Sequence, residues 1–584
     1  MPSALPSATS NDRYKWVALF NTTLGTLMAT LDASIVLIAM PDIFRGIHLD
    51  PLDPGNSSYL LWMILGFLIV TSVLVVNFGR LGDLYGRVRL YNLGFVVYTA
   101  FSLLLAIDWM SGSAGALWLV VMRVFQGVGA ALLVAQSPAI LTDAFPEDQR
   151  GLALGIQNIA GISGVFIGLV LGGLLAPIDW RLIFFISVPF GIFGTVWAYL
   201  KLEERSVRRR APIDWVGNLT FAVGLVLLMI GITYGIEPSG NSTTGWTSIP
   251  VLTELSVGIA FLIAFVVIEN SVEYPMFRLA LFRIRAFAAG TFSTLLSAIA
   301  RGGLMFILII WLQGIWLPEH GYSFSQTPLW AGIYMLPLTG GFLISGPLSG
   351  ALSDRFGARP FATGGMILSA AAYVLLMFLP VDFSYPVFAA LLFVNGIAMG
   401  TFASPNRAAV MNSLPPQHRG AGGGMNSTFQ NAAQVLSIGI FFTLLIVGLA
   451  GSLPASLTHG LTSAGLPHSQ AERLAHLPPV SVLFAAFLGI NPLTHVLGAG
   501  TIAHLPNASV LTSRSFFPSL IAAPFKSGLR EAFTFSAIAC LVAAWASWLR
   551  GGRYVFVDES KHAQARERDD QVAPDVGHPA QVGA

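Results

Sequence analysis

The sequence predicts an all-α integral membrane protein with about fourteen transmembrane helices. Hydrophobic residues make up 54% of the chain and charged residues only 10%, whereas ordinary soluble domains carry about 25% charged residues. Many apolar runs are long enough to cross a hydrocarbon core of about 30 Å. They lack the polar faces that buried helices of a large soluble protein need. A charged, glycine-rich motif occurs twice, which is typical of membrane proteins built from two related halves.

The apolar runs fall into groups of six, two and six. In the first bundle, residues 16–201, we expect spans at 16–40, 60–78, 90–108, 115–142, 152–176 and 181–201. An inserted pair within 202–286 occupies 213–235 and 250–268. The second bundle has five spans within 287–450, at 287–313, 328–352, 361–379, 386–411 and 423–450, and a last span at 529–550. Repeat signals link only the outer groups, so the middle pair is interpreted as an insertion.

The basic residues predict the orientation of the chain. Most lysines and arginines lie in the two terminal tails and in the loops that follow even-numbered spans. By the positive-inside rule, the tails 1–15 and 551–584 are cytoplasmic, the second of them disordered, and the protein is a multi-pass plasma-membrane protein. Segment 451–528 is then a long extracytoplasmic loop, in which Pro479 to Ile490 is expected as an interfacial or loop-packed helix.

Several classes of function are excluded by what the sequence lacks. The single cysteine, Cys540, rules out an intramolecular disulfide, and a net charge of +2 gives no reason to expect nucleic-acid binding. We find no phosphate-binding loop, no metal-ligand spacing, no ion-channel filter and no catalytic cluster. We therefore expect neither an enzyme nor a cofactor or metal, and a protein that works as a monomer.

The repeated motif is predicted to be a conformational gate. The first copy runs from Gly79 to Leu90, and the second from Gly350 to Arg359, each after the second span of its half. Glycine allows a tight turn between two spans, and an aspartate can pair with an arginine four positions on. The alternative is an ordinary turn. The candidate gate residues are Gly79, Asp83, Gly86, Arg87, Gly350, Asp354, Arg355, Gly357 and Arg359.

Two charged residues inside the first bundle are predicted to couple protons to transport. Asp32 lies deep in the first span, where an ionisable group is costly and is expected to be functional, here as a proton carrier. Arg123 in the fourth span keeps its proton, so it acts as a partner of a carboxylate rather than as a carrier. Gln126, three positions on, shares its helix face. The alternative is a purely structural pair.

Other intramembrane residues are candidates for packing or for a central cavity. Arg301 interrupts the first span of the second half, at nearly the pseudo-symmetric position of Asp32. We expect it to face a common cavity, where it holds Asp32 ionised or attracts an anionic or polar substrate group; a fixed structural contact is the alternative. Gln126 and Asn395 are further cavity candidates. Small residues for close helix packing are Gly127, Gly164, Gly168, Gly172 and Gly173.

Together these motifs resemble the major facilitator superfamily, in its fourteen-span drug:proton antiporter branch. The resemblance covers about 14–450 and the final span, through Leu31 to Pro41, the loop Gly79 to Leu90, Arg123 to Ala131, Asp179-Trp180-Arg181 and Ile213-Asp214-Trp215. It implies that Asp32 is the protonation site, Arg123 its coupling partner, and the loop a latch. Leu169 stands where the fifth-span motif usually has proline, so we expect a straighter helix. Ser187 stands where the family often has asparagine.

The sequence thus leads us to expect a proton-driven exporter of small lipophilic or amphiphilic compounds that works by alternating access. Its partners are protons, the small-molecule substrate and the lipid bilayer. An exporter dedicated to one endogenous lipid, siderophore or antibiotic-like metabolite is the alternative. A non-transporting membrane sensor or scaffold is a more remote one.

Overall fold

The fold class is confirmed by a computed structural model of the chain. It describes residues 8–53, 55–146, 149–205, 214–237, 239, 244–273, 275, 277–415, 419–498, 502 and 507–551. Within these residues, fourteen helices are long and apolar enough to cross a membrane. The tail expected to be disordered, from residue 552 onward, lies outside the described residues.

The first bundle is built from six spans that pack around α1. Its helices are α1 (Ala8–Gly46), α2 (Asn56–Tyr85), α3 (Arg87–Ala106), α4 (Gly112–Ala144), α5 (Arg150–Leu175), and α6 (Leu182–Phe185) with α7 (Ser187–Lys201) as one span. Helix α1 packs mainly against α5 and α4, and α4 also packs against α2 and α3.

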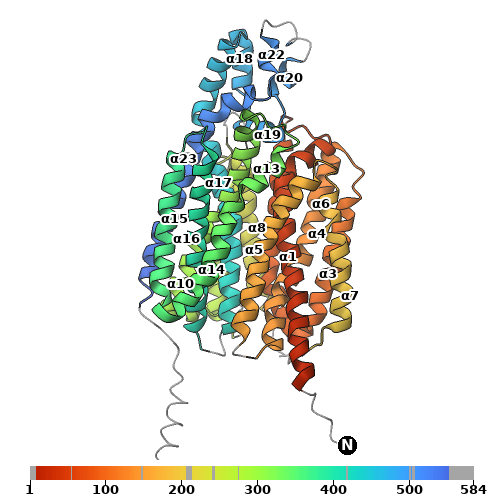
Figure 1. Cartoon of the computed structure of the whole chain (residues 1–584), viewed down its shortest axis with the longest axis vertical. Helices are drawn as coiled ribbons and strands as arrows, with labels where there is room; N and C mark the ends of the chain where they lie inside the picture. The colour runs from red at the N-terminus through yellow and green to blue at the C-terminus, as the bar shows by residue number, and fades with distance from the viewer. Residues whose placement is uncertain are drawn as a thin grey trace, which may run out of the picture.

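The second bundle repeats this order and lies beside the first (Figure 1). Its first span is broken into α10 (Arg285–Gly302), α11 (Leu304–Trp311), the π-helical turn η2 (Leu312–Trp316) and α12 (Leu317–Glu319), and its second into α13 (Thr327–Tyr334) and α14 (Leu336–Phe356). The remaining spans are α15 (Ala358–Phe378), α16 (Tyr385–Asn412), α17 (Arg419–Ser463) and α23 (Phe516–Trp548).

The two inserted spans are α8 (Trp215–Ile236) and α9 (Ile249–Ser271), which pair with each other. Helix α8 also contacts α2 of the first bundle and α17 of the second. A short 3-10 helix, η1 (Leu279–Arg283), then leads into α10. The insertion therefore lies against both halves.

The two ends of the molecule differ in charge. We call the end that holds the α2–α3 and α14–α15 turns, with Arg87 and Arg359, the basic end, and the other the opposite end. Both turns pass through a glycine with positive φ, 109° at Gly86 and 88° at Gly357. L-residues rarely adopt this conformation, so the repeated glycine is needed for two spans to follow each other directly.

The segment 451–528, expected as a long loop, is mostly helical instead. Helix α17 continues to Ser463 and α23 begins at Phe516, and between them lie α18 (His468–Ala475), α19 (Pro479–Leu488), α20 (Pro492–Leu497) and α22 (Ala508–Leu511). The two long helices project beyond the bundle and support each other, since the Ser456 hydroxyl donates to the Leu520 carbonyl over 2.8 Å (Figure 1). Their extensions are stabilised by this mutual packing, which hydropathy does not detect.

Candidate functional site

The carboxylate of Asp32 lies at the centre of a buried polar cluster in the first bundle. One oxygen accepts a hydrogen bond from Nη1 of Arg123, and the other accepts from Nε2 of Gln126 over 3.1 Å. The same Gln126 nitrogen reaches Oγ of Ser102 at 2.8 Å, and Oε1 of Gln126 accepts from Arg123 over 2.8 Å. Helices α1, α3 and α4 therefore meet at one ion pair.

This ion pair is isolated from solvent, with Asp32 0% and Arg123 1% exposed. The guanidinium group also lies 4.2 Å from the centre of the Phe67 ring and donates to the Met63 carbonyl over 3.4 Å, both on α2. A buried charge is tolerated only when paired and hydrogen-bonded. Without the Asp32 carboxylate, Arg123 would keep only Gln126 and Met63 as polar partners among the described residues, so the cluster depends on this carboxylate.

A stripe of glycines packs α5 directly against the part of α1 that carries Asp32. A Cβ atom added at Gly164 would lie 2.7 Å from the Leu27 carbonyl oxygen, and one at Gly168 would lie 2.4 Å from that of Leu31. One at Gly172 would lie 2.9 Å from the Ile35 carbonyl oxygen on the same face. Helix α5 remains one continuous helix, with Leu169 buried within it. Movement of α5 is therefore transmitted to the backbone beside Asp32.

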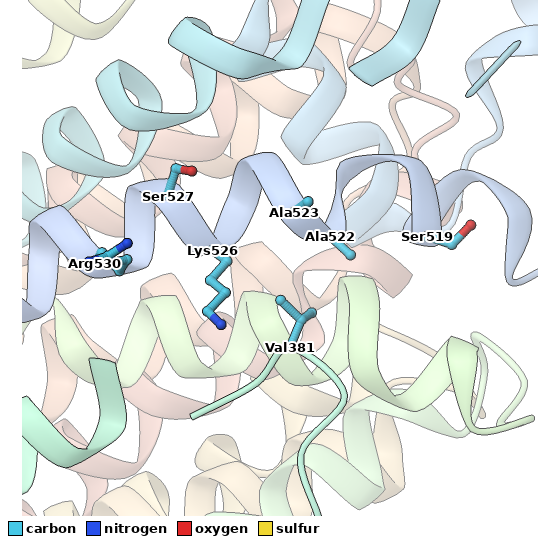
Figure 2. A pocket seen from close by; sticks show the side chains of 7 residues that line it. All are labelled: Val381, Ser519, Ala522, Ala523, Lys526, Ser527 and Arg530. Carbon is cyan, nitrogen blue, oxygen red and sulfur yellow. The ribbon is translucent and has the colours of Figure 1, made fainter. Parts of the chain in front are cut away.

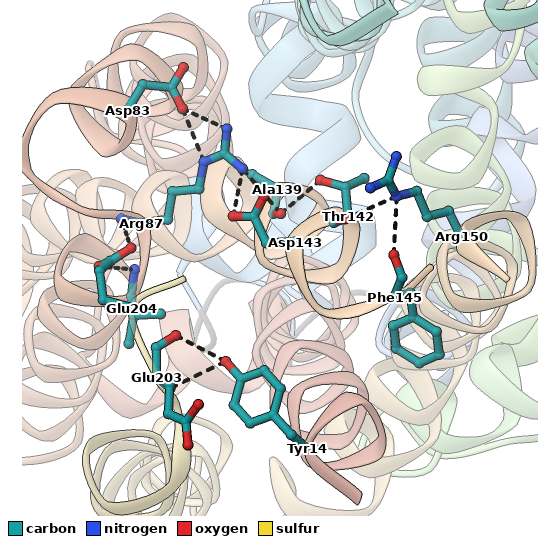
Figure 3. Close-up of polar contacts among 11 residues, drawn as sticks. Tyr14, Asp83, Arg87, Ala139, Thr142, Asp143, Phe145, Arg150, Glu203 and Glu204 are labelled. Atoms are coloured by element: carbon teal, nitrogen blue, oxygen red, sulfur yellow. Dashed lines mark hydrogen bonds and ion pairs between the residues drawn. The ribbon is translucent and has the colours of Figure 1, made fainter. Parts of the chain in front are cut away.

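At the basic end, Arg87 connects the first copy of the repeated motif to α4 (Figure 3). Its Nη2 lies 2.8 Å from Oδ1 of Asp83, and its Nη1 lies 2.7 Å from Oδ2 of Asp143. The carboxylate of Glu204, at the end of the sixth span, accepts from the backbone N–H groups of Arg87 and Val88 at 3.1 Å. The N-terminus of α3 is thus held by an acidic side chain, whose negative charge also interacts favourably with the positive end of the helix dipole.

The second copy of the motif makes different contacts. The position four residues after Asp354 is Ala358, so this copy has no equivalent of the Asp83–Arg87 pair. Arg359 instead lies over the Trp548 ring, 3.9 Å from its centre, and Arg355 lies 5.6 Å from the centre of the Phe356 ring. The sequence repeat therefore conserves the turn at Gly357, but not the arginine that follows the aspartate four positions on in the first copy.

We expect Arg87→Gln to lower the transport rate at least about tenfold with little change in stability. Ion pairs of partly exposed side chains contribute about 0–1 kcal/mol each, but a shift of about 1.4 kcal/mol between two conformations changes their ratio tenfold. Rate and thermal midpoint are measured on the same preparation. The matched control is Arg89→Gln, because Arg89 lies only two residues away and its side chain is exposed. Equal effects of the two variants would contradict a latch role for Arg87.

Arg301 does not contact Asp32, contrary to the expectation that it holds that carboxylate ionised. Asp32 is bonded by Arg123 and Gln126, whereas half-buried Arg301 has no hydrogen-bond or ion-pair partner among the described residues. It lies in the last turn of α10, immediately before the break in this span. Asn395 is fully buried and accepts from Ser369 over 3.3 Å. The pseudo-symmetric positions of Asp32 and Arg301 in the sequence therefore do not correspond to an ion pair between the two halves.

At the opposite end, the two bundles are in direct contact. The side chain of Gln313 in η2 donates to the Ile38 carbonyl of α1 over 3.2 Å. A Cβ atom added at Gly173 of α5 would lie 2.4 Å from Cα of Leu329 in α13, and one at Gly332 would lie 2.9 Å from the Leu169 carbonyl. Because backbones approach this closely, the bundles are sealed at this end.

Helix α19 adds to this seal. All ten of its residues are buried, and it contacts α1 and α2 of the first bundle as well as η2, α17 and α23 of the second. The Phe484 ring stacks on Phe442, with 5.3 Å between centres. The interfacial alternative is therefore wrong. The helix is packed, but as a plug between the two bundles rather than only within the loop segment.

Overpacking this plug is expected to destabilise the protein. A Cβ atom added at Gly314 would lie 3.2 Å from Cα of Phe487, so Gly314→Val forces η2 and α19 apart at an expected cost of about 1–3 kcal/mol. A Cβ atom at Gly451 of α17 meets nothing within 4 Å, which makes Gly451→Val the control. Thermal unfolding in detergent should show a lower midpoint for the first variant only. A similar drop in both would contradict tight packing of α19.

At the basic end, a side-chain hydrogen bond joins the two bundles. Nη1 of Arg407 on α16 lies 3.4 Å from Oδ1 of Asn158 on α5, and both side chains are exposed. Nearby, Arg80 of the first bundle donates to the carbonyl of Pro275, which precedes the second bundle, over 2.5 Å. These contacts connect the first bundle to α16 and to the segment before α10 at the basic end.

A membrane protein of two six-helix bundles with an ion pair buried in one of them has the architecture of a transporter. Residues 22–438 match the sequence model of the Major Facilitator Superfamily. The chain belongs to the Major Facilitator Superfamily, and its fourteen spans fit the fourteen-span branch. It is a multi-pass plasma-membrane transporter of a small molecule, not an enzyme.

Similar proteins include resistance and export proteins. The tetracenomycin C resistance and export protein of Streptomyces glaucescens is 27% identical over 536 residues, 91% of this chain and 90% of that protein. Multidrug resistance protein 3 of Bacillus subtilis is 26% identical over 84% of this chain and 95% of its own. The riboflavin transporter RibZ of Clostridioides difficile is 29% identical over 74% of this chain and 88% of its own. The two resistance proteins support an exporter role.

Among solved structures, a bacterial homologue of the human lysosomal transporter Spinster, in an inward-facing and unoccupied conformation, matches with a TM-score of 0.57. It is 15% identical and covers 94% of this chain and 98% of its own. A D-xylose–proton symporter matches with a TM-score of 0.50 at 15% identity, over 74% of this chain and 90% of its own. At these identities, the likeness shows the fold alone.

Sequence reasoning missed several residues that complete the site. Ser102 joins Gln126, Asp143 and Glu204 join Arg87, and Asn158 joins Arg407. The acidic pair carried a signal, because Asp143 and Glu204 follow spans that end on the arginine-rich side. Ser102 and Asn158 are ordinary polar residues within helices, and their spacing gave no sign of a partner.

Proposed function

We propose that this chain is a proton-driven exporter of small lipophilic or amphiphilic compounds that works by alternating access. The observation that carries the proposal is the buried cluster of Asp32, Arg123 and Gln126, which is at once costly and able to change charge. The proton gradient supplies the energy, so no cofactor is needed. The basic end faces the cytosol, as its arginines suggest, and one chain is the working unit.

In this proposal, Asp32 is the proton carrier and Arg123 is its coupling partner. Ionised Asp32 holds α1 against α4 through Arg123 and Gln126. Protonation weakens this contact, and Gln126 Oε1, which already accepts from Arg123, retains the guanidinium group. The resulting shift of α1 carries α5 with it through the glycine stripe, and α5 contacts the second bundle at Gly173. Charge on one carboxylate is thereby linked to the contact between the bundles.

A dedicated exporter of one compound is the second candidate. It is favoured by the tetracenomycin C resistance and export protein, whose name states a single compound and which matches along nine tenths of both chains. The buried cluster of Asp32, Arg123 and Gln126 does not identify the residues that contact the substrate. The proposed proton mechanism is therefore the same for both candidates. They differ only in the range of compounds exported.

Efflux from cells tests these candidates. Cells that express the protein are loaded with a panel of fluorescent lipophilic cations and neutral dyes, with and without a protonophore. The proposal predicts export of several dyes and its loss when the protonophore is added. Export of none of the dyes would favour the dedicated exporter. Export that survives the protonophore would contradict proton coupling.

A further inference from the structure

A cationic cavity lies on the outer surface of the second bundle, away from the Asp32 cluster. It has a volume of about 420 Å³ and lies between α23 and Val381 of the turn that joins α15 to α16 (Figure 2). Its α23 wall is a single helical stripe of Ser519, Ala522, Ala523, Lys526, Ser527 and Arg530. The two alanines leave room beside the two cations, and the serines add hydroxyl groups.

The cavity lies at the boundary of the hydrocarbon layer. At the basic end, α23 finishes at Trp548, whose exposed ring stacks with Arg359, as expected for an aromatic residue at the membrane interface. Lys526 lies 548 − 526 = 22 residues before it, about 33 Å along the helix, and Arg530 lies 18 residues before it, about 27 Å. These distances bracket a hydrocarbon core of about 30 Å. The cavity is therefore at headgroup depth in the leaflet of the opposite end.

The two cations have no counter-charge of their own. Among the described residues, neither Lys526 nor Arg530 has a hydrogen-bond or ion-pair partner for its side chain, and like charges four positions apart on a helix repel. Asp382, next to Val381, lies 3.3 Å from Nε2 of His320 instead. An anion between the two side chains would relieve this repulsion.

An apolar surface continues from the cavity toward the middle of the membrane. Helices α15 and α23 pack together, with the Thr534 hydroxyl 3.3 Å from the sulfur of Met377 just below the cavity. Along their seam, large side chains are open to lipid, among them Leu375, Phe378, Ile538 and Leu541. A ligand with an anionic head and acyl chains would meet cations above and apolar side chains below.

We propose that this cavity binds the phosphate headgroup of an anionic membrane lipid, with its acyl chains along the α15–α23 seam. Lys526 and Arg530 bind the phosphate, and Ser519 and Ser527 offer hydroxyl groups to the glycerol part of the headgroup. A snorkelling side chain alone would need no cavity and no second wall at Val381. Free phosphate shares the headgroup chemistry but gains nothing from the apolar seam, which is why a lipid is favoured.

Native mass spectrometry of the full-length, delipidated protein in detergent tests this proposal. Phosphatidylglycerol, phosphatidylethanolamine and inorganic phosphate are added separately, and bound ligand is counted. Wild type is expected to retain phosphatidylglycerol in preference to both others. Lys526→Gln combined with Arg530→Gln is expected to weaken that binding about ten- to thirty-fold, the effect of two cations that face an anionic headgroup.

Controls separate this site from general attraction to charge. Arg473→Gln combined with Arg514→Gln removes two exposed cations of the same end outside the cavity and should leave binding unchanged. Lys526→Arg combined with Arg530→Lys keeps both charges and should keep the lipid. Equal retention of phosphatidylethanolamine by wild type would overturn the proposal without any variant. Undiminished phosphatidylglycerol binding in the Gln double variant, or equal binding of free phosphate, would also overturn it.

Discussion

Asp32→Asn is expected to abolish proton-driven export while the protein remains folded in the membrane. Asparagine keeps the shape of the side chain and can still accept a hydrogen bond from Arg123, but it neither carries a proton nor balances the guanidinium charge. Breaking a buried ion pair by removing one partner costs about 3–5 kcal/mol. The expected result is therefore loss of export, measured in membranes, together with a lower thermal midpoint, measured on the purified protein.

A matched control separates loss of function from loss of stability. Asp42→Asn changes the same residue type on the same helix, where the carboxylate pairs with Arg45 over 2.7 Å near the helix end. We expect this variant to export at close to the wild-type rate. Export by Asp32→Asn at the wild-type rate, or loss of export by both variants alike, would contradict the assignment of Asp32 as the proton carrier.

A chemical cross-link between Asn158→Cys and Arg407→Cys is expected to stop export almost completely. These side chains join α5 of the first bundle to α16 of the second at the basic end, 3.4 Å apart. Alternating access requires the bundles to separate at each end in turn, so a covalent bridge holds the basic end closed. A short, reducible, bifunctional thiol reagent should block export, and a reducing agent should restore it.

The control for this experiment is a cross-link within one bundle. Lys15→Cys and Gln149→Cys lie at the same end, where Nζ of Lys15 donates to Oε1 of Gln149 over 3.0 Å, and both belong to the first bundle. Their cross-link should leave export intact. Cys540, the single native cysteine, is buried and does not compete for the reagent. Export that continues with Asn158 and Arg407 bridged would contradict movement of the bundles against each other.

The fold class and the buried ion pair were predictable because the membrane restricts both the length of apolar runs and the placement of charges. A span needs a long apolar run, and a charge within it needs a partner, so Asp32 and Arg123 were natural candidates to meet. The turn at Gly86 was predictable for the same reason, since a glycine between two spans signals a conformation that other residues avoid.

What the sequence did not reveal depends on contacts between distant segments. Asp143 and Glu204 reach Arg87 from near the ends of two other spans; their position on the arginine-rich side was a signal, but their spacing does not identify Arg87 as the partner. Pseudo-symmetry suggested that Arg301 holds Asp32 ionised, but Asp32 is bonded by Arg123 and Gln126 of its own bundle. Helix α19 is too short to span a membrane, so its burial between the bundles is decided by α1, η2 and α17 around it.

The most direct test of proton coupling is proton movement itself. The purified protein is reconstituted into liposomes that contain a pH-sensitive dye, and an exported compound from the dye panel is added to one side. Wild type is expected to move protons in the direction opposite to the compound, and Asp32→Asn is expected to move none. Transport of the compound by wild type without proton movement, or unchanged proton movement in Asp32→Asn, would contradict proton coupling through Asp32.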